Sequence, residues 1–345
     1  MKYPGSFWMP RRMSINSSFS GPRPLTVLLI LLVATFLVAA SDPVTSVKVR
    51  PGDSISYLAF KHLHTYNQEI VNQIKSLNPH IKDLNLIQVG QTVYLPKRKP
   101  STVTGKRGEP TPSAPVPETS KMAAAASQAV ATLVEGEVQM TAAETNSWQR
   151  LQINAILKAG DRVRVLDQGR LELVLDNRSV LRLAANTTLE LKEVERRPQK
   201  EKYRFALSVG KMWTRVTRLL GFGSKYQVET PTAITAVQGT VYDLQVDPSQ
   251  QTRVRVHSGN VQVYNPFAGD LAPGQKVPKL KEPTRVPGPT RISREQWEQL
   301  LLGQYQQVTL GREGRSAISA FDLAAARREA WVRWNEARDR DLYGE

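Results

Sequence analysis

Apolar residues recur at every second position through most of residues 130–265. The segment LELVL at 171–175 is followed by the polar turn DNRS and then by VLRL at 180–183, while VRV at 254–256 is followed by HSGN and VQV. Alternation at period two places successive side chains on opposite faces of a β-strand. Short turns of this kind between two strands predict hairpins. We therefore expect an all-β body in which each strand buries one face.

A short pattern repeats within this body, as EGEVQM from residue 135, VGKMWT from residue 209 and SGNVQV from residue 258. Each copy is a glycine, one polar residue and then a strand with alternating apolar residues. Such recurrent units predict a layered body, either a sandwich or a short solenoid.

The segment TPTAITAVQGT at 230–240 leads into another alternating strand. Pro231 keeps the preceding strand from continuing straight, the small residues let the chain pass close to the sheet, and Gly239 permits a bulge or a close backbone approach. We expect Pro231, Gly239 and Thr240 to form a structural corner, with no catalytic role.

Residues 130–272 resemble the FecR domain, and TPTAITAVQGT is the most specific motif of that resemblance. The family includes membrane-spanning regulators that relay outer-membrane signals to a cytoplasmic sigma factor. That role needs a folded cytoplasmic region before the membrane segment, and only about 24 residues precede the apolar segment here, too few for a domain. The interpretation that remains is an extracytoplasmic binding or scaffold module.

Proline-rich segments divide the chain into a multidomain protein. Residues 97–129 and 273–290 are rich in proline and poor in large apolar residues, a composition typical of extended linkers. They separate a small module at 46–96, the β-rich body at 130–272 and a tail at 291–345. In the tail, a capping box at Ser293 and Gln296 and apolar residues at three- and four-residue spacing predict helices near 297–308 and 318–341.

The sequence of the small module predicts elements in the order strand, helix, helix, strand. The turn PGDS opens a helix that Asp53 or Ser54 can cap, Asn-Pro at 78–79 ends a second helix, and GQTVYLP forms the closing strand. Over residues 46–96 these motifs closely resemble the LysM module, apart from a longer first helix region and Val89 in place of a frequent proline.

The LysM resemblance implies binding of peptidoglycan or another N-acetylglucosamine-containing glycan in a shallow groove. One side of that groove is the first strand–helix turn, and the other is the loop before the last strand. Backbone groups there read the acetamido group while apolar residues cover the sugar face. The implied glycan-binding residues are Gly52, Asp53, Ser54 and Ile55 on the turn and Pro79, His80, Ile81, Leu86 and Ile87 on the loop.

The N-terminus indicates export. Residues 25–40 read LTVLLILLVATFLVAA, follow several arginines and end in small residues, the layout of a signal peptide; an uncleaved membrane anchor is the alternative. We therefore place residues 46–345 outside the cytoplasm, in the periplasm or cell envelope, which excludes nucleic acid as a partner.

The net charge of +16 favours anionic partners. Arg253 and Arg255 alternate with Val254 and Val256, so we expect both arginines on the outward face of one strand. There they would form a surface for an anionic envelope polymer, or a solvated face that blunts edge pairing.

The sequence holds no cysteine and no recognisable nucleophile elbow, phosphate loop or zinc motif, so we expect neither enzyme activity nor a metal or other cofactor. We interpret the chain as a noncatalytic envelope protein that binds peptidoglycan through the LysM-like module and presents the FecR-like module to a second ligand or as a scaffold. The alternatives are an envelope signalling or stress-sensing protein that contacts a membrane protein, and an accessory factor of a cell-wall hydrolase or a hydrolase with unrecognised acids.

Overall fold

The computed structural model describes residues 44–97, 128–265 apart from 144, 146 and 198, and 299–344. The predicted signal segment at 1–40, the linker at 273–290 and nearly all of the linker at 97–129 lie outside the described residues. No helix within the described part of the chain is both long and apolar enough to cross a membrane.

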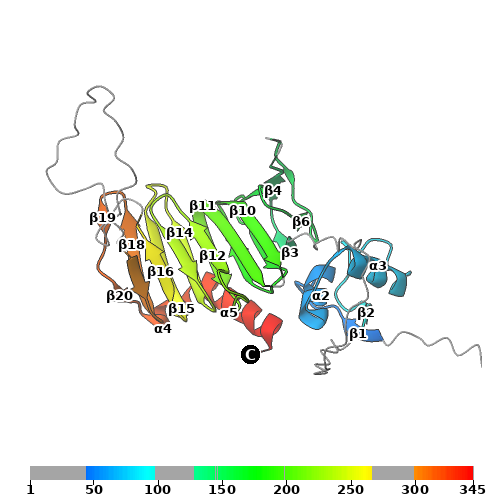
Figure 1. Cartoon of the computed structure of the whole chain (residues 1–345). Helices are drawn as coiled ribbons and strands as arrows, with labels where there is room; N and C mark the ends of the chain where they lie inside the picture. The colour runs from blue at the N-terminus through cyan, green and yellow to red at the C-terminus, as the bar shows by residue number, and fades with distance from the viewer. Residues whose placement is uncertain are drawn as a thin grey trace, which may run out of the picture. The chain divides into compact units, whose positions relative to one another are not determined.

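The small module has the predicted order of elements, β1 (Val44–Lys48), α2 (Ile55–Leu63), α3 (Gln68–Leu77) and β2 (Thr92–Pro96) (Figure 1). β1 and β2 pair antiparallel with Val47 opposite Val93. Ser54 caps α2, because its Oγ accepts a hydrogen bond from the backbone N–H of Tyr57 at 3.1 Å. Asn78 follows α3, and its side chain joins the end of that helix to the backbone of Tyr94 in β2.

The β-rich body contains eighteen strands among the described residues. Their bounds are β3 (Ala129–Glu135), β4 (Val138–Thr141), β5 (Gln149–Arg150), β6 (Ile156–Leu157), β7 (Arg162–Val165), β8 (Arg170–Leu175), β9 (Val180–Leu183), β10 (Thr187–Arg197), β11 (Lys200–Arg215), β12 (Lys225–Glu229), β13 (Ile234–Val237), β14 (Val241–Val246), β15 (Thr252–Ser258), β16 (Val261–Tyr264), β17 (Gln299–Leu302), β18 (Gln306–Gly311), β19 (Gly314–Arg315) and β20 (Ser319–Ala320).

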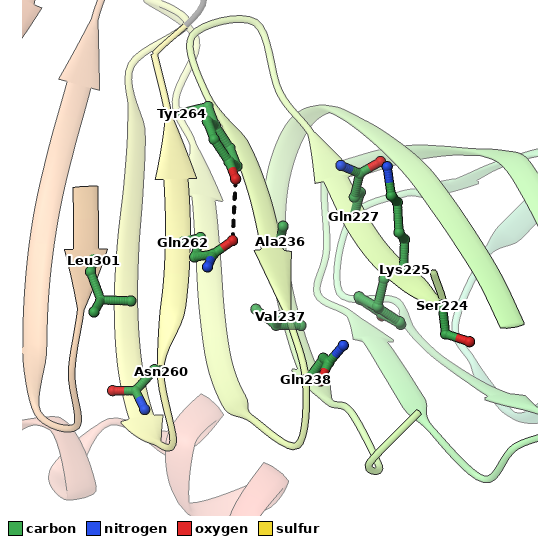
Figure 2. Close-up of a pocket in the computed structure, with 11 residues that line it drawn as sticks. Ser224, Lys225, Gln227, Ala236, Val237, Gln238, Asn260, Gln262, Tyr264 and Leu301 are labelled. Carbon is green, nitrogen blue, oxygen red and sulfur yellow. Dashed lines mark hydrogen bonds between the residues drawn. The ribbon is translucent and has the colours of Figure 1, made fainter. Parts of the chain in front are cut away.

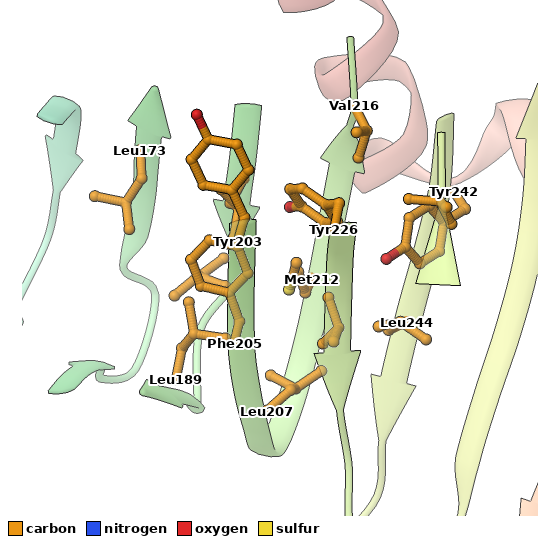
Figure 3. Close-up of a cluster of buried hydrophobic side chains, with 14 of the residues drawn as sticks. Leu173, Leu189, Tyr203, Phe205, Leu207, Met212, Val216, Tyr226, Tyr242 and Leu244 are labelled. Atoms are coloured by element: carbon orange, nitrogen blue, oxygen red, sulfur yellow. The ribbon is translucent and has the colours of Figure 1, made fainter. Parts of the chain in front are cut away.

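The strands pair into two sheets that share β11. Sheet I contains β3, β6, β8, β9, the second half of β11, β14, β15 and β18 to β20. Sheet II contains β4, β5, β7, β10, the first half of β11, β12, β13, β16 and β17. All pairs are antiparallel except β11 with β12. Apolar side chains of both sheets form one core, part of which is drawn in Figure 3 around Tyr203, Phe205, Met212, Tyr226 and Leu244. The predicted layered all-β body is therefore confirmed.

The repeated glycines mark the points where the chain passes from one sheet to the other. Gly136 lies between β3 and β4, Gly210 lies inside β11 where its pairing changes sheet, and Gly259 lies between β15 and β16. All three have positive φ, and a Cβ would come within 3 Å of a neighbouring strand or corner at each of them. A residue with a side chain would be strained there, so the repeat reflects a steric requirement of the crossing.

The two turns that looked alike in sequence have different roles. The turn at 176–179 joins the antiparallel neighbours β8 and β9, so this hairpin prediction is confirmed. The hairpin predicted at 258–260 is wrong, because β15 pairs with β14 and β18 in sheet I while β16 pairs with β13 and β17 in sheet II.

The segment that was expected to form a corner contains one hairpin turn and one crossing between the two sheets. Pro231 lies in the turn between the antiparallel strands β12 and β13, and Gly239 lies between β13 of sheet II and β14 of sheet I. Gly239 has a φ of +62°, and Thr240 beside it donates a hydrogen bond to the carbonyl of Asn260 at 2.8 Å. Two sheet crossings therefore contact each other at this end of the body.

The prediction of a helix near 297–308 is wrong. From residue 299 the chain forms β17 and β18, which pair with β16 and β15 and so extend both sheets. Leu300, Leu302, Val308 and Leu310 are buried in the core shared by the sheets, because their period-two spacing matches a strand. The predicted capping box at 293–296 lies outside the described residues. The second predicted helix is present as α4 (Leu323–Arg328) and α5 (Ala330–Tyr343).

Candidate functional site

The first side of the implied glycan groove, here called the turn rim, is Gly52, Asp53, Ser54 and Ile55. Gly52 has a φ of +82°, and Asp53 accepts a hydrogen bond from the backbone N–H of Arg50 at 2.8 Å. Ser54 and Ile55 are buried, with 2% and 0% of their surface exposed. The turn is therefore formed as expected, but its last two residues, at the start of α2, are buried in the protein.

The second side, here called the loop rim, is Pro79, His80, Ile81, Leu86 and Ile87. Pro79 and His80 are exposed, and Leu86 keeps 73% of its surface exposed. Ile81 belongs to the core of the small module, so it supports the loop from below. The exposed apolar groups that this rim offers to a sugar face are Pro79 and Leu86.

Asn154, in the loop before β6, places its side chain between the two rims. Its Oδ1 accepts a hydrogen bond from the backbone N–H of Ser56 at 2.9 Å, next to the turn rim. Its Nδ2 donates to Oδ1 of Asn85 at 2.8 Å and to the carbonyl of Leu84 at 3.4 Å, next to Leu86 of the loop rim. One carboxamide from the β-rich body thus bridges the segments that carry the two rims.

Helix α5 also contacts the turn rim and the helix that follows it. Asp341 accepts hydrogen bonds from Tyr57 at 2.5 Å and from Lys61 at 2.6 Å. Burial alone would raise the pKa of Asp341, but the hydrogen bonds from Lys61 and Tyr57 outweigh burial and lower it below its usual range. Arg338 donates to the carbonyl of Gly52 at 3.2 Å and lies over the ring of Tyr57, 4.1 Å from its centroid.

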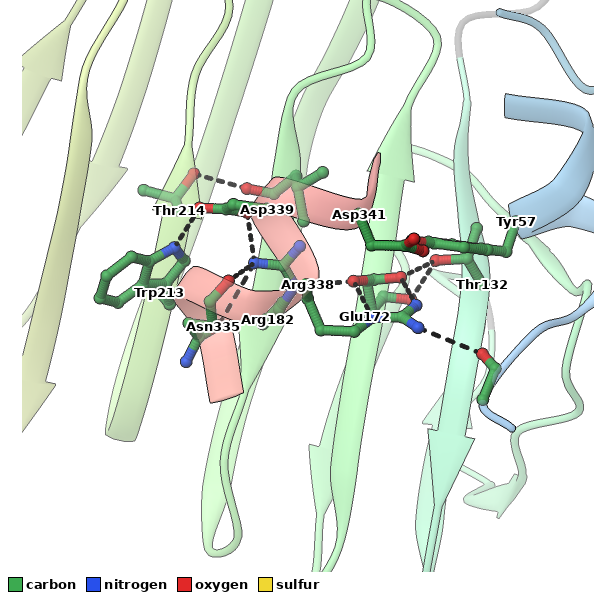
Figure 4. Close-up of polar contacts among 12 residues, drawn as sticks. Tyr57, Thr132, Glu172, Arg182, Trp213, Thr214, Asn335, Arg338, Asp339 and Asp341 are labelled. Atoms are coloured by element: carbon green, nitrogen blue, oxygen red, sulfur yellow. Dashed lines mark hydrogen bonds and ion pairs between the residues drawn. The ribbon is translucent and has the colours of Figure 1, made fainter. Parts of the chain in front are cut away.

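A buried charge network holds α5 on sheet I (Figure 4). Glu172 accepts from Arg338 and from Arg182, each at 2.6 Å, and Arg182 donates to Asp339 at 2.6 Å. Trp213 donates to the same Asp339 at 3.2 Å. Burial would raise the pKa of Glu172, but the two guanidinium groups lower it to about 2. The carboxylate is therefore charged throughout the physiological range and links the helix to the sheet.

The sequence interpretation missed Asn154, Arg338 and Asp341, because each acts on residues far away in the chain. Tyr57 and Asp341 are separated by 284 positions. The available local signal was an asparagine, a residue that is favourable for the left-handed backbone seen there.

Arg253 and Arg255 lie on the same strand face, as predicted, but α4 and its flanking residues cover part of that face. Arg255 is 5% exposed and pairs with Asp243 at 3.0 Å and with Glu329 at 2.7 Å. The expectation that Arg255 faces solvent is therefore wrong. Arg253 is half-buried and donates to Gln245 at 2.6 Å. Binding of an anionic polymer here stays a prediction, to which Arg255 contributes no free charge.

Sheet II carries a separate hollow of about 450 Å³ on its outer side (Figure 2). Four amide side chains contribute to its lining, and Tyr264 donates a hydrogen bond to Gln262 at 3.2 Å. Its labelled amide residues are Gln227, Gln238, Asn260 and Gln262. The hollow holds no carboxylate that would suit acid–base chemistry.

The described residues contain no group of three or more histidine or acidic side chains placed to hold a metal ion. His257 and Asp243 contact each other at 2.6 Å in a buried position beside Trp213. Arg255 shares this carboxylate, so the arrangement is that of an ion-pair network between strands β14 and β15.

Residues 47–96 match the family model of the LysM domain, and residues 161–262 match that of the FecR protein. LysM domains bind N-acetylglucosamine-containing glycans such as peptidoglycan, and both domains are typical of extracytoplasmic proteins. No curated protein matches the chain.

Two similar solved structures, at 2.50 and 1.65 Å resolution, are each described as a "putative anti-sigma factor" from Parabacteroides distasonis. The first is 16% identical to this chain with a TM-score of 0.35, and the match covers 49% of this chain and 64% of the first structure's chain. The second is 15% identical with a TM-score of 0.35, and the match covers 53% of this chain and 75% of the second structure's chain. These scores are too low to carry an argument about function. The family matches carry the identification: this chain contains a LysM domain at residues 47–96 and a FecR domain at residues 161–262.

Proposed function

We propose that this protein is a noncatalytic component of the cell envelope that binds peptidoglycan through its LysM domain. The FecR-containing body presents a second surface, for another ligand or as a scaffold. The observation that carries the proposal is the match of residues 47–96 to the LysM family, and the exposed Pro79, His80 and Leu86 of the loop rim support it.

The chemistry of the groove suits a neutral sugar better than a charged one. Its neutral polar groups include backbone N–H and C=O groups and the amide of Asn85, whose Oδ1 accepts from Asn154, while Leu86 offers an exposed apolar surface. Backbone groups and amides read an acetamido group through paired donors and acceptors, and an apolar side chain covers the face of a pyranose ring.

The full-length protein should co-sediment with insoluble peptidoglycan, and soluble chitotetraose should compete. Leu86→Asp is expected to weaken co-sedimentation about tenfold, because it places a charge against the sugar face, a cost of about 1.4 kcal/mol. Val89→Asp is the matched control, since Val89 is also an exposed apolar residue, at 66%, in the same loop but outside the loop rim.

Full-strength binding by Leu86→Asp would remove the loop rim from the proposal. Loss of binding in Val89→Asp alone would transfer the site to the hollow beside β1, which Val89 helps to line together with Pro51 and Asp53.

A second candidate function is envelope signalling, and the specific observation that favours it is the FecR match over residues 161–262. In this function the FecR domain contacts a membrane protein and the LysM domain reports on the wall. Capture of a specific membrane protein by the full-length chain, dependent on the FecR domain, would favour signalling over a scaffold.

A further inference from the structure

The side chain of Asn154 carries the same functional group that a LysM groove is expected to read. An acetamido group presents one carbonyl acceptor and one N–H donor, and the Asn154 carboxamide presents a carbonyl acceptor and two N–H donors. Its acceptor is bound by Ser56 N–H at 2.9 Å and its donor by Asn85 Oδ1 at 2.8 Å. The chain therefore supplies its own amide at the place where a sugar amide is expected.

The backbone holds Asn154 in position for this contact. Asn154 has a φ of +65°, a left-handed conformation that asparagine tolerates better than most residues. Its N–H donates to the carbonyl of Ala131 at 2.8 Å, and the Ala131 N–H donates to Ala155 at 2.9 Å. The loop is thus fixed to β3 on both sides of Asn154, and its side chain is presented without further ordering.

Neighbouring polar groups of the turn rim are also taken by the chain itself. Ser54 donates its hydroxyl to the carbonyl of Thr132 in β3 at 2.7 Å, and the carbonyl of Gly52 accepts from Arg338 of α5. Apolar residues of the β-rich body and of α5 join the LysM core at the same contact, namely Val130, Val174, Val180 and Leu342.

We infer that the LysM groove is occupied by the protein's own Asn154 carboxamide, so that a glycan and the β-rich body compete for it. The inference rests on the proposed function and adds its regulation: glycan binds fully only when the LysM domain separates from β3 and α5. Binding is therefore coupled to a change in the contact between the domains, since a ligand shifts an equilibrium by its preference for one state.

The test compares full-length wild type with Asn154→Ala, using calorimetric titration with chitotetraose and hydrogen exchange at the Ser56 amide. Asn154→Ala removes the internal amide while leaving the groove intact. We expect chitotetraose to bind about tenfold more tightly, which corresponds to about 1.4 kcal/mol, and the Ser56 amide to exchange faster. Gln152→Ala, an exposed residue of the same loop, is the matched control and should change neither.

A second variant opens the groove from the side of α5. Asp341→Lys removes the acceptor of Tyr57 and Lys61 and places a like charge beside Lys61, so it should also tighten glycan binding. Glu336→Lys is its control, because Glu336 lies on the same helix and pairs with Arg327 instead of the LysM domain.

The outcomes separate the two proposals. Equal affinity in wild type, Asn154→Ala and Asp341→Lys would overturn the competition. Unchanged Ser56 exchange in Asn154→Ala would overturn the internal occupancy. Faster exchange with no glycan binding in any variant would overturn the proposed function and the competition while upholding the occupancy.

Discussion

The two rims of the LysM groove come from one small domain, yet they have different surroundings. The turn rim meets β3 and α5, and Ser54 and Ile55 are buried there. The loop rim keeps Pro79, His80 and Leu86 exposed. The fold of the domain explains how both rims form, but the rest of the chain decides which of them a ligand can reach. A LysM match therefore predicts a groove without predicting its accessibility.

The largest expected effect comes from the buried network that holds α5 against the turn rim. Glu172→Gln leaves the guanidinium groups of Arg182 and Arg338 without their shared carboxylate. Removing one partner of a buried ion pair costs about 3–5 kcal/mol. We expect a loss of this size in the free energy of unfolding, measured by denaturant titration, and faster exchange at Ser56.

The control for this variant is Glu336→Gln, which breaks the more exposed pair with Arg327 and should cost less than about 1 kcal/mol. The Tyr94 amide, held locally by Asn78 at 2.8 Å, should keep its exchange rate in both variants. Equal loss of protection at Ser56 and Tyr94 would mean that the network does not act on the turn rim alone.

A smaller effect is expected from the corner at Gly239, which touches neither rim. Gly239→Val forces a β-branched residue into a φ of +62° and should lower the melting temperature, with a cost of about 1–3 kcal/mol. A Cβ there meets no atom within 4 Å, so the cost is backbone strain without a clash. Gly303→Ala, at a glycine whose φ lies outside the positive region, is the control. A melting temperature as high as that of wild type would show that the corner accepts any residue.

The smallest effect concerns the pH dependence of the contact with α5. The pKa of Asp341 is lowered, so its stabilising contribution is present above the ordinary value of 3.8 and is lost as pH falls through the folded value. The contribution should be under about 1 kcal/mol, because the side chain is 38% exposed. Stability curves of wild type and Asp341→Asn should converge in acid and separate above pH 4. Parallel curves over the whole range would exclude Asp341 as a charged link.

Local signals predicted the LysM domain well, because its helix boundaries depend on residues within a few positions. Ser54 caps α2, and Asn78 and Pro79 end α3, whatever the rest of the chain does. The same kind of signal gave a wrong hairpin prediction at 258–260, because a glycine such as Gly259 is equally suited to a hairpin turn and to a sheet crossing. The strands that pair with β15 and β16 are distant in sequence. At 299–310, the spacing of the apolar residues fits both a helix and a strand. Pairing with β15 and β16 makes the segment a strand.

The residues of the two rims could be proposed from the LysM resemblance, but their surroundings could not. Asn154, Thr132 and Arg338 contact the LysM domain across at least 69 positions of chain, and nothing near Gly52 or Ser54 specifies those partners. Arg255 illustrates the same limit, because Glu329, its partner, is 74 positions away.

A distance measurement between the LysM domain and the β-rich body tests the competition most directly. The chain has no cysteine, so spin labels attached through Asn72→Cys and Lys211→Cys, both exposed positions, report one distance by pulsed electron paramagnetic resonance. We predict a narrow distribution without ligand and a broad one at saturating chitotetraose, with Asn154→Ala broadening at lower ligand concentration. A distribution that stays narrow while calorimetry shows the groove saturated would contradict the account.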